Sequence, residues 1–175
     1  MGASGTEMRE AGEAPPVASL ASVSLRRSGV TRPPAAAAAP SPVPSGEDRK
    51  AVIAWWRALR RGRDLPAVDD LDRAAIAAAW PEAMLLAYDA GGDAVTRATR
   101  LSTDAIVPGA IVEYSPMVTE WLLAAARRAA RSAAPLEEER GFPVGRGLAL
   151  YRLLALPLGS GRHGVDHVLC RIGVE

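Results

Sequence analysis

The chain has few of the residues that build disulfides or membrane spans. Cys170 is the only cysteine in 175 residues, which excludes an internal disulfide and fits a reducing compartment. No apolar run approaches the roughly 18–20 residues that a membrane-spanning helix needs. The first thirty residues lack the basic start and apolar run of a secretory signal. We therefore expect a cytoplasmic protein with no membrane partner.

Lysine is nearly absent as well, since Lys50 is the only one and arginine carries the remaining positive charge. Together with the excess of alanine, glycine and proline, this composition is typical of a GC-rich bacterial coding bias. The net charge of +1 gives no general attraction to nucleic acids. The arginine clusters at residues 60–63 and 127–131 lie near expected helix ends, where cations favour the helix dipole. We expect no nucleic-acid partner.

Residues 1–45 are predicted to be a disordered Ala/Pro-rich arm. They contain many prolines but few large apolar side chains, so burial cannot offset the entropy lost on ordering. The folded domain is expected over residues 46–175, beginning with a helix that Ser45 caps. The apolar stripe of this helix is too large for a solvent-facing helix. We expect it to pack on the domain body, on a second copy of the chain, or on both. Its candidate dimer or partner surface consists of Trp55, Trp56 and Leu59.

The remaining pattern predicts an α+β fold. A short helix ends at Pro81, a buried strand follows over residues 84–88, and a weaker strand over residues 95–101 can pair with it. Ser115 and Pro116 mark the start of a long helix that runs to about residue 131. A short edge strand over residues 136–140 and an apolar hairpin over residues 148–172 complete an antiparallel sheet, which we expect helices to cover on one side.

No set of side chains predicts catalysis or metal binding. His163 and His167 lie four residues apart, but neighbouring glycines place them at a turn and a strand start, and no further ligands are evident. His167 and Cys170 lie three apart in a strand and so point to opposite faces, which makes Cys170 a small buried residue. The consecutive glutamates at residues 137–139 are interpreted as a solvated strand edge.

Three stretches carry a resemblance to the PAS-like family of single-domain proteins common in alphaproteobacteria. They are WWRALRRGRDLPAVDDLD (residues 55–72), AAWPEAMLLAYD (78–89) and YRLLALPLGSGRHGVDHVLCRI (151–172). The resemblance implies a five-stranded antiparallel sheet with flanking helices, a sensory or interaction role and no catalysis. The chain departs from the family in the middle, where residues 97–101 lack an expected glycine. The cofactor is unknown, because the cysteine and histidines do not match the helix positions of flavin-binding and haem-binding relatives.

The resulting hypothesis is a regulatory module in which a small molecule or a protein partner favours one packing of the helices on the sheet. Its candidate partners include a second copy of the chain and a downstream signalling protein. Two alternatives stay open: a ligand-free interaction module and a small pocket enzyme. A cavity on the order of a few hundred Å³ would favour ligand binding. The predicted pocket lining is Leu86, Trp121, Leu153, Leu156, Val168 and Cys170.

Overall fold

A computed structural model describes residues 42–89, 93–103, 114–159 and 164–174. All of them belong to one compact unit, Ala38–Glu175. Residues 1–41 of the predicted arm lie outside the described residues, as does His163. In chain order the described elements are α1 (Arg49–Leu59), the 3-10 helix η1 (Val68–Asp70), α2 (Arg73–Ala79), β1 (Met84–Tyr88), β2 (Val95–Arg100), α3 (Pro116–Ser132), β3 (Leu136–Val144), β4 (Gly147–Leu158) and β5 (His167–Val174).

Contacts with the folded domain begin before residue 46. Val43 packs against the apolar cluster around α1, and the carbonyl of Pro44 accepts a 2.9 Å hydrogen bond from Nε1 of Trp80. The cap of α1 is Asp48, whose carboxylate accepts a hydrogen bond from the backbone N–H of the first turn. The prediction that Ser45 caps this helix was therefore wrong: the structure places the cap three residues later.

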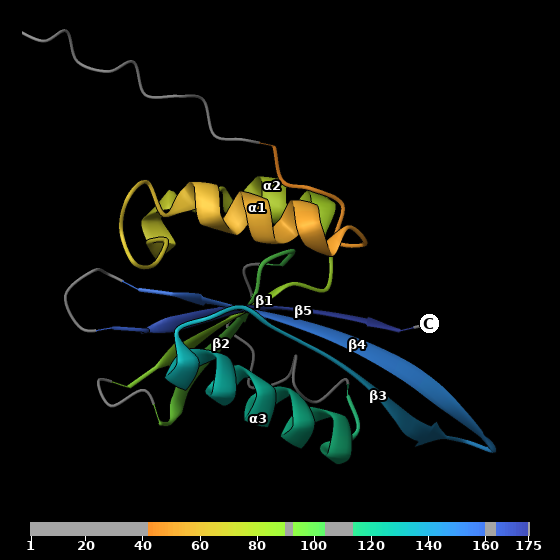
Figure 1. The fold of residues 1–175 in the computed structure, drawn as a ribbon. Helices are drawn as coiled ribbons and strands as arrows, with labels where there is room; N and C mark the ends of the chain where they lie inside the picture. The colour runs from red at the N-terminus through yellow and green to blue at the C-terminus, as the bar shows by residue number, and fades with distance from the viewer. Residues whose placement is uncertain (1–41, 90–92, 104–113, 160–163, 175) are drawn as a thin grey trace, which may run out of the picture. The chain divides into compact units, whose positions relative to one another are not determined.

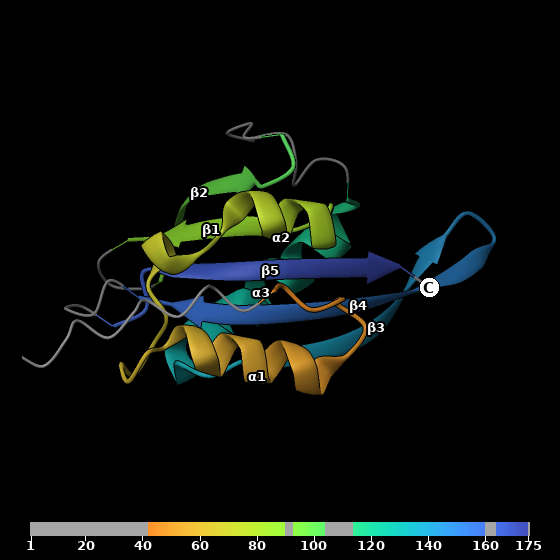
Figure 2. The ribbon, with the colours of Figure 1, turned by 90° about the horizontal axis from the view of Figure 1, so that it is seen from above.

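The five strands form one sheet in the order β2-β1-β5-β4-β3, with every neighbouring pair antiparallel. This confirms the α+β fold with a five-stranded antiparallel sheet. β3 is longer than the predicted edge strand, because Gly145 at φ 59° lets the chain turn tightly and keeps β3 paired with β4 up to Val144. Among the described residues, residues 147–150 of β4 pair with β3 alone, so the β3–β4 hairpin extends beyond β5 (Figure 2).

Helices cover both faces of the sheet (Figure 1), so the prediction of cover on one side was wrong. α1 and α2 pack on one face, called here the α1 face, and α3 packs on the other, the α3 face. Side chains of β4 alternate between them: Leu153 faces α3, whereas Leu154 faces α1. A nearly continuous apolar strand such as residues 153–158 is typical of a strand that is buried on both faces.

Candidate functional site

The predicted partner surface on α1 is buried within its own chain. Trp55, Trp56 and Leu59 are only 6, 4 and 7% exposed. Nε1 of Trp56 donates a 2.9 Å hydrogen bond to the carbonyl of Pro157 in β4, and the ring of Trp55 meets the ring of Trp80 edge-on at 5.4 Å. These side chains fill the layer between α1 and the sheet. They cannot contact a partner while α1 stays packed, so this prediction is corrected.

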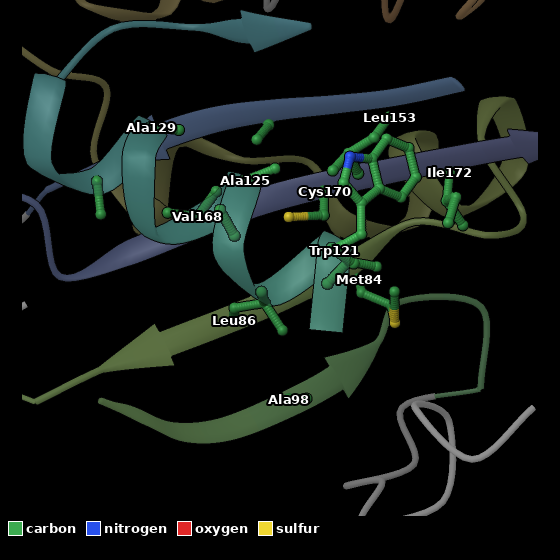
Figure 3. Close-up of a cluster of buried hydrophobic side chains, with 14 of the residues drawn as sticks. Met84, Leu86, Ala98, Trp121, Ala125, Ala129, Leu153, Val168, Cys170 and Ile172 are labelled. Atoms are coloured by element: carbon green, nitrogen blue, oxygen red, sulfur yellow. The ribbon is translucent and has the colours of Figure 1, made fainter. Parts of the chain in front are cut away.

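Most of the predicted pocket lining does gather in one place, on the α3 face (Figure 3). Leu156 does not, because it lies in the cluster on the α1 face. Leu153 and Leu156 are three residues apart in β4, so strand alternation sends them to opposite faces. The same rule separates His167 from Cys170. Applied to the sequence alone, it could have excluded Leu156 from the predicted pocket lining. The residues that remain together are Leu86, Trp121, Leu153, Val168 and Cys170.

Small side chains let α3 approach the sheet closely. The helix starts as predicted, with Ser115 as its cap and Pro116 in its first turn. Ala125, Ala126 and Ala129 are fully buried in its middle and second half. Because alanine has no side chain beyond Cβ, the helix backbone lies near the strands, and the larger residues of the sheet shape the space beneath it.

A hydroxyl and a thiol, those of Tyr88 and Cys170, are buried on the α3 face. Tyr88, at the end of β1, is 7% exposed, and within the described residues its hydroxyl oxygen has no hydrogen-bond partner. Burial raises the pKa of Tyr88; Cys170 raises it further, and Arg127 of α3 lowers it. Burial also raises the pKa of the Cys170 thiol to about 12. The thiol therefore stays protonated at neutral pH, which disfavours nucleophilic attack and metal binding by this cysteine.

The first half of α3 is anchored to β3 by Trp121. Its Nε1 donates a 3.0 Å hydrogen bond to Oε2 of Glu138, and Arg128 forms an ion pair with the other oxygen of the same carboxylate. The ring of Trp121 lies 5.4 Å from the ring of Phe142, also in β3. Glu138 thus joins β3 to α3, although the sequence suggested a solvated edge. Both contacts come from α3, the element that directly precedes β3 in the chain, so the role of Glu138 depends on how α3 packs against β3.

A groove opens beside this anchor, between the N-terminal half of α3 and β3. It has a volume of about 450 Å³. Trp121 is the only predicted pocket residue that lines it, so this groove differs from the cluster beneath α3. The complete lining is Met117, Glu120, Trp121, Ala124, Arg140, Gly141, Phe142 and Pro143. A smaller hollow of about 340 Å³ lies between residues 62–65 and Gly164.

Nothing in the described part of the chain assembles a metal centre, since no three His, Cys, Asp or Glu side chains gather there. Nδ1 of His167 lies 2.9 Å from Oδ1 of Asp166, and His167 and Cys170 stand on opposite faces of β5. None of the described helices has the length and apolar character that crossing a bilayer requires. Comparisons with protein-family models, curated proteins and solved structures found no match.

Proposed function

We propose that the chain is a PAS-like sensory or regulatory module without catalysis of its own, which binds a small molecule between α3 and the sheet. The Tyr88 hydroxyl, which has no hydrogen-bond partner among the described residues, carries this proposal. A buried hydroxyl without a hydrogen bond costs about 1–3 kcal/mol, and a polar molecule bound beside it would recover that free energy. The antiparallel sheet with flanking helices supports the PAS-like part of the proposal, because the sequence resemblance implies this layout.

The signal would be a change in how α3 packs on the sheet. α3 is held at both ends: Trp121 binds Glu138 of β3, and Arg131 forms a 2.9 Å ion pair with Asp93, just before β2. A molecule beside Tyr88 would reach the second half of the helix, where Arg127 lies. Small buried alanines in that half lose little apolar contact area when the helix moves. A ligand with higher affinity for the displaced helix would then shift the population.

Native mass spectrometry of freshly purified protein tests the proposal. The wild-type protein is expected to carry a small molecule whose mass disappears when the same sample is denatured. Tyr88→Phe is expected to lose this extra mass, whereas the matched control Tyr151→Phe keeps it, since Tyr151 is only half-buried. A native spectrum that shows the bare polypeptide mass for the wild-type protein would contradict ligand binding.

A ligand-free interaction module is the second candidate function. Leu86, Leu153, Val168 and Cys170 are fully buried on the α3 face, as expected for a core filled by its own side chains. In that case the groove beside α3 would be the recognition surface. Bare polypeptide mass together with a partner or a second copy in the native spectrum would favour this function.

A pocket enzyme has the least support. A general acid or base works best with a pKa near the working pH. Under α3, burial moves the pKa values of Tyr88 and Cys170 away from neutrality. Neither group is therefore suited to proton transfer or nucleophilic attack at pH 7.

A further inference from the structure

The groove between α3 and β3 carries one charge on each wall. Glu120 lies on the α3 wall and Arg140 on the β3 wall. Both side chains are exposed, and within the described residues neither has an ion-pair partner. The guanidinium of Arg140 lies over the ring of Phe142, 5.4 Å from its centre. Opposite charges that line one groove without meeting leave room for an occupant that pairs with both.

Exposed apolar side chains lie on the same face. Three of the four exposed large apolar side chains among the described residues lie here: Met117, Val144 and Val174 are 50, 54 and 59% exposed. The fourth, Leu148, is 75% exposed and projects from the opposite face of β4. Met117 lines the groove, and Val144 follows Phe142 by two residues, so both side chains project from the same face of β3. Val174 lies in the same cross-strand row as Arg140, with Tyr151 between them. Exposed apolar side chains with polar residues at their rim are typical of a protein interface.

We propose that the occupant is the same groove of a second copy of the chain, packed about a twofold axis. A twofold rotation through the groove sets the helix wall of one copy against the strand wall of the other. Glu120 of each copy then meets Arg140 of the other, so the dimer contains two ion pairs and each of the four charges is paired once. An acidic peptide would pair only with Arg140 and a basic peptide only with Glu120. The charge pattern is therefore complementary to itself.

The same rotation brings Met117 of one copy toward Phe142 and Pro143 of the other. Methionine and arginine side chains are long and adaptable, and both are enriched at protein interfaces. They can reach into the facing groove, which has a volume of about 450 Å³ in each copy. Because the contact is confined to one groove and its rim, we expect a dimer that dissociates on dilution.

Sedimentation velocity measures self-association of the wild-type protein and of charge-reversal variants over a concentration range from about 1 µM to 1 mM. The wild-type protein is expected to dimerise as its concentration rises. Glu120→Arg gives a groove with two positive walls, and Arg140→Glu gives one with two negative walls. Each is expected to weaken self-association by roughly tenfold or more, because two like-charge contacts replace two ion pairs in every dimer. Circular dichroism melts check that each variant is folded.

Two further samples separate a specific contact from a folding defect. The double variant Glu120→Arg/Arg140→Glu restores both ion pairs and is expected to dimerise within about threefold of the wild type. An equimolar mixture of the two single variants is expected to form a heterodimer, since each positive wall then faces a negative one. Arg57→Glu, on the exposed side of α1, is the matched control and should leave the dimer unchanged.

Three outcomes would overturn the proposal. One is a wild-type protein that stays monomeric over the whole concentration range. Another is a dimer that tolerates both single reversals as well as it tolerates Arg57→Glu, because the contact would then lie on another surface. The third is a mixture of folded single variants that forms no heterodimer.

Discussion

Replacing Tyr88 by phenylalanine should stabilise the protein. In the structure the Tyr88 hydroxyl is buried and, within the described residues, unpaired, at a cost of about 1–3 kcal/mol. Phenylalanine keeps the ring in place and removes only the oxygen, and the small space it leaves costs less than about 1 kcal/mol. The free energy of unfolding should therefore rise by about 1 kcal/mol, whereas most substitutions of buried residues lower it.

Urea denaturation monitored by tryptophan fluorescence measures this change. With a slope of about 2 kcal/mol per molar urea, a gain of 1 kcal/mol moves the midpoint up by about 0.5 M. The protein should first be unfolded and refolded, so that a bound small molecule does not supply the missing hydrogen bond. Tyr151→Phe is the control, since Tyr151 is half-buried, and its effect should stay within about 0.5 kcal/mol.

A decrease of about 1 kcal/mol or more in Tyr88→Phe would refute this reasoning. It would mean that the hydroxyl donates or accepts a hydrogen bond in the refolded protein. The proposal that a ligand satisfies the hydroxyl would then lose its principal support. The dimer proposal would be unaffected, because it depends on Glu120 in the first half of α3 and on Arg140 in β3.

Two further predictions concern the Cys170 thiol and the cap of α1. Burial raises the pKa of Cys170 from 9.0 to about 12. As the pH rises, the unfolded chain therefore releases this proton before the folded protein does. The contribution of the thiol to the free energy of unfolding is complete below pH 9 and is lost as the pH rises toward 12. Chemical denaturation between pH 8 and 11 should show a steeper loss of stability for the wild type than for Cys170→Ala; parallel curves would contradict it. Asp48→Ala should lower the free energy of unfolding by about 1 kcal/mol and Ser45→Ala by much less; equal effects in thermal melts would contradict the assigned cap.

Local signals made parts of the fold predictable from the sequence. Ser115 followed by Pro116 marks the start of α3, because the serine side chain accepts a hydrogen bond from the first turn and proline needs no N–H there. The apolar run of residues 84–88 is β1, and residues 95–100 pair with it as predicted. The closing hairpin was predictable because two long apolar runs flank a glycine-rich segment.

The candidate sites were less predictable, because they depend on which side chains meet across the sheet. The apolar stripe of α1 indicated a buried helix face but not which surface covers it, so the domain body and a second copy both stayed open as the surface that Trp55 and Trp56 contact. Strand alternation would have separated Leu156 from Leu153 and can be applied to a sequence alone. The alternation of the glutamates in β3 could not show that Glu138 meets Trp121, since that contact requires α3 to lie on that face.

The sequence by itself determined the elements of this protein, since caps, prolines, glycines and apolar periodicity act within a few residues of the chain. Only the tertiary structure decided what those elements bring together. It placed helices on both faces of the sheet, left the Tyr88 hydroxyl buried without a partner in the described residues, and set Glu120 and Arg140 on opposite walls of one groove. The physical reason is that burial and charge pairing depend on distances between remote segments, which only the packing of α3 against the sheet determines.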